Sequence, residues 1–111
     1  LFYKKVDKMK INSVSSLSDQ EDDVQLPELV YWASLGNTAR VRQLLADGID
    51  PNQSDEEGYS ALQAAAENDH LDVVKLLVSK GADISFKGQY TALELAEMAQ
   101  NTQIVQYLKD L

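Results

Sequence analysis

Residues 69–83 read Asp-His-Leu-Asp-Val-Val-Lys-Leu-Leu-Val-Ser-Lys-Gly-Ala-Asp, and residues 36–50 read Gly-Asn-Thr-Ala-Arg-Val-Arg-Gln-Leu-Leu-Ala-Asp-Gly-Ile-Asp. The two stretches are similar at an offset of 33 residues, which aligns Val41 with Val74. A period of this length is typical of a chain built from stacked copies of one small unit. Such stacks usually form an extended surface that binds another macromolecule, and seldom a catalytic pocket.

One unit can be followed in detail between residues 58 and 83. Ser60 is a favourable N-cap for a first helix, in which the small side chains of residues 64–66 would let a neighbouring helix approach closely. A second helix is expected over residues 71–79, and Gly81 is suited to the left-handed conformation that follows a last helical turn. Together these signals predict an antiparallel pair of helices.

The chain divides into an N-terminal stretch and three such units. Residues 1–25 are polar, and we expect a flexible extension in which residues 1–8 precede a natural start at Met9. In the third unit Thr91 is the expected N-cap, and in the first unit Pro27 is expected in the first helical turn. The core side of the third unit is expected to comprise Leu93, Leu95, Ala96, Ile104, Val105, Tyr107 and Leu108. The three units are expected over residues 26–55, 56–87 and 88–111.

The composition is that of an ordinary globular chain, with 111 residues, 44% hydrophobic and 25% charged. No apolar run is long enough to predict a membrane-spanning helix, and the first residues lack the apolar core of a secretory signal. The chain has no cysteine, which excludes disulfides and thiolate metal ligands. We therefore expect a cytoplasmic protein that does not bind membranes and is monomeric on its own.

The net charge of −8 is carried mainly by the repeated part of the chain and by residues 12–30, which contain no Lys or Arg. Nucleic-acid binding requires clustered positive charge, so we do not expect a nucleic-acid partner. A negatively charged body favours a basic protein partner. The alternative is that the charge only keeps the protein in solution.

The second unit carries the most complete pattern of turn, small and apolar residues. Its members are Asp55, Gly58, Ser60, Leu62, Ala65, Ala66, His70, Val73, Val74, Leu76, Leu77, Gly81, Ala82 and Asp83. This pattern resembles the ankyrin repeat family, and the first and third units match it at fewer positions. The resemblance covers residues 26–111 and implies an all-α solenoid of three stacked helix-turn-helix units with short extended or β-turn loops.

Several positions depart from the family pattern. Trp32 stands where a small alanine is usual, Gln63 replaces a histidine, and Glu97 replaces the second alanine of the last unit. A terminal repeat has only one neighbour, so its outer face can be polar or bulky. These departures indicate an N-terminal capping repeat over residues 26–55, a regular central repeat, and a C-terminal capping repeat over residues 88–111.

The sequence offers no catalytic, cofactor-binding or metal-binding motif. His70 is the only histidine, and the resemblance places it at the turn between two helices, where its ring would bond to backbone groups. The carboxylates are numerous, but their spacing matches no calcium loop. We expect a protein without enzymatic activity, cofactor or metal, since none of the clusters that a catalytic site requires is present.

The family resemblance implies that a partner contacts the loop tips and the exposed side of the first helices. The positions that correspond here are Glu56, Glu57, Tyr59, Glu67, Asn68, Lys87, Gln89, Tyr90 and Met98. Tyr59 and Tyr90 occupy equivalent turns, and exposed aromatic side chains are frequent in interfaces. The alternative for each tyrosine is packing against its own loop.

These features predict a non-catalytic module for protein–protein interaction. Two more specific roles remain open. The first is a bacterial inhibitor or immunity-type protein that neutralises a toxin or nuclease, which the short acidic chain favours. The second is a fragment of a larger ankyrin scaffold whose binding surface lies elsewhere.

Overall fold

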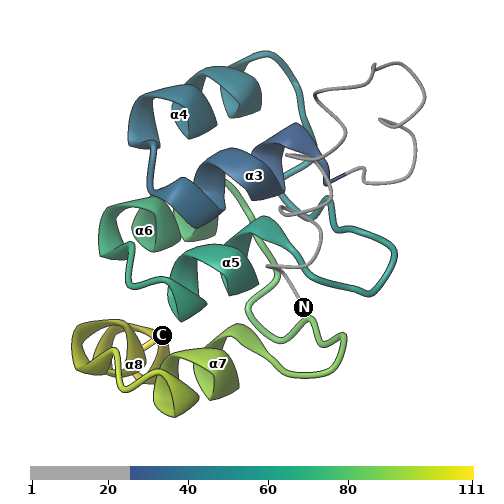
Figure 1. Ribbon diagram of the computed structural model, residues 1–111. Helices are drawn as coiled ribbons and strands as arrows, with labels where there is room; N and C mark the ends of the chain where they lie inside the picture. The colour runs from purple at the N-terminus through teal and green to yellow at the C-terminus, as the bar shows by residue number, and fades with distance from the viewer. Residues whose placement is uncertain (1–25) are drawn as a thin grey trace, which may run out of the picture.

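The computed structural model describes residues 26–111, which form six helices (Figure 1). They are α3 (Glu28–Leu35), α4 (Thr38–Ala46), α5 (Ala61–Glu67), α6 (Leu71–Ser79), α7 (Ala92–Met98) and α8 (Thr102–Lys109). Within this part of the chain the extended structure is limited to one isolated bridge between Ser54 and Ser60. The all-α prediction is confirmed, whereas the predicted N-terminal extension lies outside the described residues.

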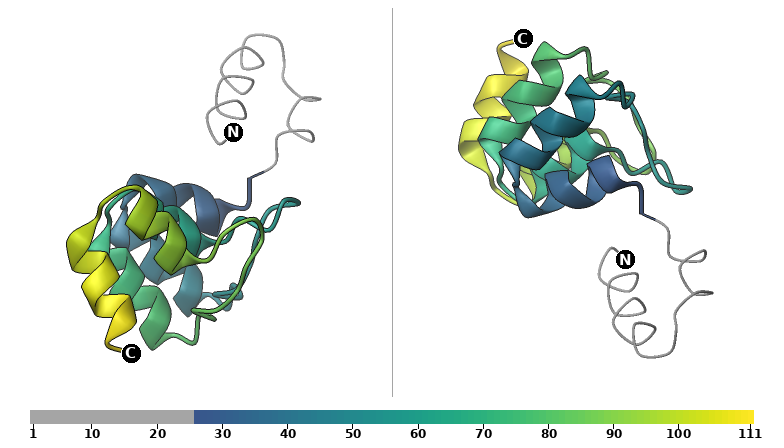
Figure 2. Two further views of the ribbon diagram at one scale, coloured as in Figure 1. Left: turned by 90° about the horizontal axis from the view of Figure 1, so that it is seen from below. Right: turned by 90° about the horizontal axis from the view of Figure 1, so that it is seen from above.

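The helices form two layers that run along the stack. An inner layer of α3, α5 and α7 lies side by side, and an outer layer of α4, α6 and α8 packs against it (Figure 1). The loops between successive units extend together from the same end of the helices (Figure 2). No helix of residues 26–111 has both the length and the apolar character needed to cross a bilayer.

The starts of the inner helices follow from capping chemistry. In α5 the Ser60 hydroxyl accepts from the amide of Gln63, whose side chain accepts in turn from the Ser60 amide. Thr91 and Glu94 form the same reciprocal pair at the start of α7. Such a capping box satisfies two amides that would otherwise lack partners in the first helical turn. The two predicted N-caps are therefore confirmed.

Pro27 differs slightly from its prediction. Its ψ of 142° is not helical, so it is the N-cap that precedes α3 and not a residue of the first turn. Its carbonyl still accepts the first helical hydrogen bond, from the amide of Tyr31 at 3.0 Å.

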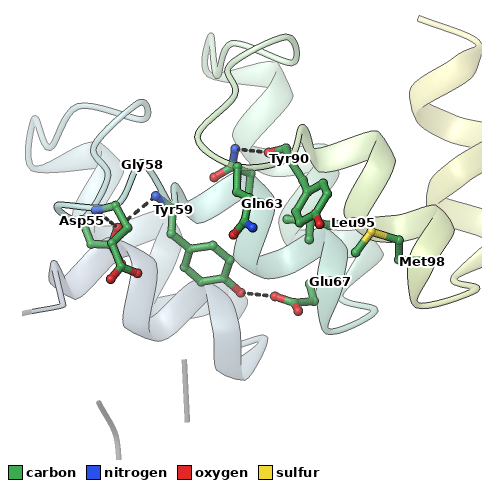
Figure 3. Close-up of a pocket in the computed structure, with 10 residues that line it drawn as sticks. Asp55, Gly58, Tyr59, Gln63, Glu67, Tyr90, Leu95 and Met98 are labelled. Atoms are coloured by element: carbon green, nitrogen blue, oxygen red, sulfur yellow. Dashed lines mark hydrogen bonds between the residues drawn. The ribbon is translucent and has the colours of Figure 1, made fainter. Parts of the chain in front are cut away.

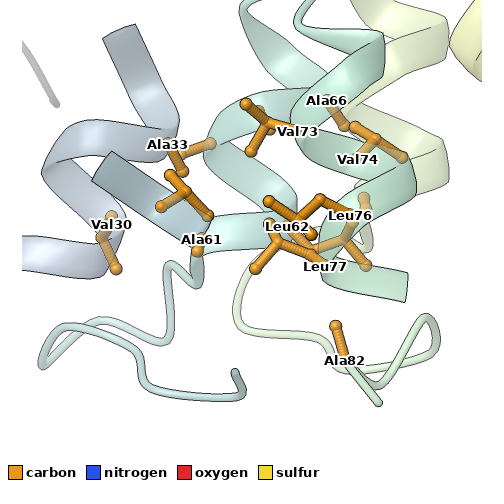
Figure 4. Packing of buried hydrophobic residues seen from close by; sticks show 14 of the residues in the cluster. Val30, Ala33, Ala61, Leu62, Ala66, Val73, Val74, Leu76, Leu77 and Ala82 are labelled. Carbon is orange, nitrogen blue, oxygen red and sulfur yellow. The ribbon is translucent and has the colours of Figure 1, made fainter. Parts of the chain in front are cut away.

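Small side chains allow the inner helices to approach one another. Ala61, Ala64, Ala65 and Ala66 of α5 are all fully buried, and α5 packs against both α3 and α7. Leu62 lies toward Leu76 and Leu77 of α6 (Figure 4). One continuous apolar cluster therefore extends from α3 to α8 through the middle unit.

The third unit is less completely buried than the second. Ile104 and Leu108 of α8 lie in the core, as predicted, but Val105 and Tyr107 are only half-buried. Leu93, which corresponds to the buried Leu62, is also half-buried. The physical reason is position, because no further described unit covers this end of the stack.

Side-chain hydrogen bonds join successive units at the C-terminal ends of the inner helices. Nε2 of His70 lies 3.1 Å from the carbonyl oxygen of Ser34 at the end of α3. At the equivalent position Asn101 donates to the carbonyls of Ala66 and Glu67 at the end of α5, at 2.7 and 3.1 Å. The last carbonyls of a helix have no partner within it, so these side chains satisfy groups that would otherwise be exposed.

Candidate functional site

A groove opens where the second and third units meet on the inner side of the stack (Figure 3). We call it the junction groove, and its volume is about 200 Å³. Its lining residues are Asp55, Glu57, Gly58, Tyr59, Gln63, Glu67, Gln89, Tyr90, Leu95 and Met98. Residues 55–67 contribute the three carboxylates of the groove and one tyrosine, and residues 89–98 contribute the second tyrosine and the apolar side chains.

Six of the nine residues predicted to bind a partner line this groove. They are Glu57, Tyr59, Glu67, Gln89, Tyr90 and Met98. The other three, Glu56, Asn68 and Lys87, are not among the lining residues. Asn68 has a local role, because its side-chain amide donates to the carbonyl of Ala64 at 2.9 Å and closes the end of α5. Whether any of the nine contacts a partner stays a prediction.

Asp55 shapes the loop that carries Tyr59. One of its carboxylate oxygens accepts from the amides of Glu57 and Tyr59, at 2.8 and 3.0 Å. Its own amide donates to the carbonyl of Tyr59 at 3.1 Å, which folds the segment into a tight turn. The Asp55 side chain thus fixes the direction in which the Tyr59 ring leaves the backbone.

The hydroxyl of Tyr59 reaches across the groove and donates to Oε1 of Glu67 at 2.5 Å (Figure 3). Burial of the half-buried ring raises the pKa of Tyr59 well above its usual range, and the hydrogen bond to Glu67 raises it further. The nearby charges of Glu67 and Asp55 act in the same direction. Tyr59 therefore stays a neutral donor, and it holds the Glu67 carboxylate in a defined position.

Gln63 connects the two walls of the groove. Its side chain is only 2% exposed, and its amide nitrogen donates to the carbonyls of Phe86 and Tyr90, at 3.1 and 2.8 Å. Both carbonyls belong to the loop before α7, so a residue of the second unit positions Tyr90 of the third. A buried polar side chain with all its polar atoms bonded rigidifies its surroundings.

The apolar side of the groove is open to solvent. Tyr90 and Met98 are 37% and 58% exposed, although both are large and mainly apolar. Leu95 lies beneath them and is buried. Exposed apolar side chains that converge on a concave surface are characteristic of binding sites.

Four lining residues were not predicted as site residues. Asp55 and Gly58 were recognised only as part of the loop pattern, and Leu95 only as core. Gln63 had a readable signal, because Ser60 and Gln63 have the spacing of a capping box. No pattern in the sequence predicted its hydrogen bonds to the carbonyls of Phe86 and Tyr90.

Two other candidate residues have structural environments away from the groove. Trp32 is half-buried, packs edge to face on Tyr31 with ring centroids 5.0 Å apart, and lies beneath the guanidinium of Arg40. His70 bonds to the backbone of Ser34, in agreement with the structural role that the sequence predicted. Among residues 26–111 no three acidic, histidine or cysteine side chains are grouped closely enough to hold a metal ion.

Comparison with known proteins identifies the repeats. Over 63 residues the chain is 41% identical to an ankyrin repeat-containing protein of Schizosaccharomyces pombe, an alignment that covers 57% of this chain and 30% of that protein. Over 83 residues it is 40% identical to the ankyrin repeat and KH domain-containing protein mask-1 of Caenorhabditis elegans, covering 72% of this chain and 3% of that protein.

An E3 ubiquitin-protein ligase of Gallus gallus is 41% identical over 61 residues, which are 55% of this chain and 6% of the ligase. The chain thus spans only a minor part of each relative's length. The family model for ankyrin repeats, in three copies, matches residues 29–111. The chain therefore belongs to the ankyrin repeat family, whose repeats generally mediate protein–protein interaction.

Proposed function

We propose that this chain is a non-catalytic protein-binding module whose partner is a basic protein held along the junction groove. The observation that carries the proposal is the groove's composition. Tyr90 and Met98 expose apolar surface, and three carboxylates, those of Asp55, Glu57 and Glu67, lie on the same groove. Among residues 26–111, no Lys, Arg or His lines the groove.

This arrangement supports binding in two ways. The exposed ring of Tyr90 and the thioether of Met98 offer apolar area that a partner would bury, and aromatic side chains commonly dominate the binding energy of an interface. The carboxylates would attract a positively charged partner and speed its approach. The contribution of charge is screened by salt, whereas that of apolar burial is not.

The test is a comparison of matched variants. The full chain is immobilised and exposed to a lysate of its source organism at low salt and at about 0.5 M salt, where charge steering is screened. One variant carries Tyr90→Ala and Met98→Ala in the groove. The control variant carries Leu35→Ala and Leu111→Ala, which remove exposed apolar side chains that do not line the groove.

We expect a basic protein to bind the wild-type chain and the control equally. The groove variant should bind it more weakly by about 2 kcal/mol or more, the loss typical of anchor residues. Equal binding to all three chains would contradict the assignment of the groove as the interface. A captured partner that is acidic would contradict the proposed role of the carboxylates.

A further inference from the structure

We propose that the junction groove holds the side chain of a single arginine from the partner, with its guanidinium bound to Glu67. This inference rests on the proposed function and specifies what the groove recognises. The position of Glu67, the size and lining of the groove, and the distribution of positive charge in the described part of the chain support it.

Glu67 is held from two sides before any partner arrives. Its Oε1 accepts the hydroxyl of Tyr59, and its backbone carbonyl accepts the side-chain amide of Asn101 at 3.1 Å. Its other carboxylate oxygen, Oε2, has no hydrogen-bond or ion-pair partner within residues 26–111. One oxygen is therefore fixed and the second can accept a charged donor.

No basic side chain of residues 26–111 forms an ion pair with Glu67. It is the last residue of α5, and the last turn of this helix contains no basic residue. The carbonyl end of a helix carries partial negative charge, which a cation stabilises and a carboxylate does not. The side chains of Lys87 and Lys109 act elsewhere, because Lys87 influences Glu94 and Lys109 lies 3.9 Å from Glu97.

The size of the groove fits one side chain. Its volume of about 200 Å³ is below the range of roughly 300–1,000 Å³ that is usual for small-molecule sites. Leu95 and Met98 provide an apolar surface for a methylene stem, and the Glu67 carboxylate lies between them and the hydroxyl of Tyr59 (Figure 3). A long side chain with an apolar stem and a cationic head matches both surfaces.

Arginine matches these surfaces better than lysine does. Its guanidinium is planar, stacks on tyrosine rings, and presents several donors to a carboxylate at once. Tyr59 and Tyr90 place two rings in the groove beside Glu67. The ammonium of lysine is a compact and strongly hydrated charge that gains less from such a planar site.

The probe is an acetylated and amidated pentapeptide, Gly-Gly-Arg-Gly-Gly, titrated into the isotope-labelled full chain and followed by amide NMR shifts. Two further peptides replace the arginine by citrulline, which has nearly the same shape without the charge, or by lysine. We expect the arginine peptide to shift amides of the groove, centred on Tyr59, Glu67 and Tyr90, at roughly millimolar affinity. The lysine peptide should bind more weakly, and the citrulline peptide should leave these amides unshifted.

Two charge-matched variants locate the binding. In Glu67→Gln the new amide oxygen can still accept from Tyr59, so the groove is expected to keep its shape, which the NMR spectrum itself will report. This variant should bind the arginine peptide about 10-fold more weakly, as expected for the loss of a charge-assisted hydrogen bond. Glu28→Gln removes the same charge from an exposed acid of α3 that does not line the groove, and should bind as the wild type does.

Several outcomes would overturn the inference. These are equal shifts with the citrulline peptide, equal losses in the two variants, stronger binding of the lysine peptide, or no groove shifts up to about 20 mM arginine peptide. Failure of the proposed function is separate. If the captured partner is lost on Tyr90→Ala with Met98→Ala but retained on Glu67→Gln, the groove binds the partner without an arginine at Glu67. If neither change affects capture, the groove is not the interface.

Discussion

Tyr59 has a double role, since its ring lines the junction groove and its hydroxyl positions Glu67. A tyrosine in such a place is usually judged by its apolar area alone. Here the hydrogen bond also links the end of the loop to the end of α5, which are eight residues apart in the sequence. The shape of the groove therefore depends on the protonation of one phenol.

Replacement of Tyr59 by Phe should reduce the loss of stability at alkaline pH. Because burial and the bond to Glu67 raise the pKa of Tyr59, the folded chain keeps a proton that the unfolded chain loses above about pH 10. The stabilisation is intact below that pH and declines above it, by up to about 1.4 kcal/mol per pH unit. Urea denaturation between about pH 9 and 11 should show a shallower decline for Tyr59→Phe.

The control for this experiment is Tyr90→Phe. Tyr90 lines the same groove, but its hydroxyl makes no hydrogen bond with any residue of 26–111. The alkaline decline should be as steep in this variant as in the wild type. An unchanged decline in Tyr59→Phe would mean that Tyr59 does not keep its proton in the folded state.

Gly36 is required for two separate reasons, and the chain allows them to be distinguished. Its φ is 75°, and a Cβ there would lie 2.6 Å from Cε1 of the His70 ring. Gly48 has a φ of 99° and no atom within 4 Å of its would-be Cβ. Gly48→Ala should therefore show only the cost of a left-handed conformation, about 1 kcal/mol. Gly36→Ala should cost more in denaturant titrations, because it also displaces His70 from Ser34.

A double-mutant cycle tests the steric part of this argument. In a His70→Ala background the ring is absent, so the additional cost of Gly36→Ala over Gly48→Ala should largely disappear. Equal costs of the two glycine changes in the wild-type background would show that the His70 ring moves aside without penalty.

The helices α5 and α7 begin with the same capping box but differ in what their third residue does beyond the cap. Gln63 of α5 caps its own helix and also donates to the carbonyls of Phe86 and Tyr90. Glu94 of α7 caps its own helix, and the amide of Thr91 holds the pKa of this carboxyl below its usual range. The two residues therefore distinguish the contribution of a helix cap to stability from the contribution of the hydrogen bonds that Gln63 makes to the loop before α7.

Gln63→Ala should therefore destabilise the chain more than Glu94→Ala does. The loss of a cap costs about 1 kcal/mol in either helix, and two carbonyls left without a donor add about 1–3 kcal/mol in the case of Gln63. Chemical denaturation of both variants measures the difference. Similar values would mean that water replaces the Gln63 amide at little cost.

How many of a helix's contacts can be predicted from the sequence depends on how far away its partners lie along the chain. The starts of α5 and α7 were predicted because Ser60 and Thr91 are three residues from the groups they bond. The second role of Gln63 was not predicted, because its acceptors are 23 and 27 residues away. The half-burial of Leu93 was missed for a related reason, since periodicity marks an apolar face but not what covers it.

Residues 26–111 form a stack in which the helices of the second unit pack against those of the first and of the third. Long arrays of this kind can unfold in parts, because their stability is a sum of local terms. Here one apolar cluster passes through all three units, and hydrogen bonds from His70, Asn101 and Gln63 join the units at both ends of the inner helices. Three units are also close to the minimum for a stable array.

We therefore expect the three units to unfold in a single transition. Trp32 is the only tryptophan and lies in the first unit, so its fluorescence reports on that unit, whereas far-UV circular dichroism reports on all helices. The two signals should give the same midpoint in urea. A fluorescence transition at lower urea would show that the first unit unfolds separately.

The sequence predicted which surface carries the candidate site, but not which side chains form the groove. The family resemblance placed Tyr59, Tyr90 and Met98 on the inner side, and the structure brings all three to one groove. It could not show that Glu67 is held by Tyr59 or that Lys87 is outside, because side-chain direction in loops depends on contacts between units.

The junction groove is built from residues 55–67 and residues 89–98. Its binding properties therefore belong to two adjacent repeats together and not to a single repeat. Gene duplication that inserted one new repeat between them would preserve the fold yet separate the two halves of the groove. At the other junction Val30 and Ser34 stand at the positions of Gln63 and Glu67, so the same architecture there lacks this carboxylate. In this architecture, a change in which repeats are adjacent changes what the chain can bind.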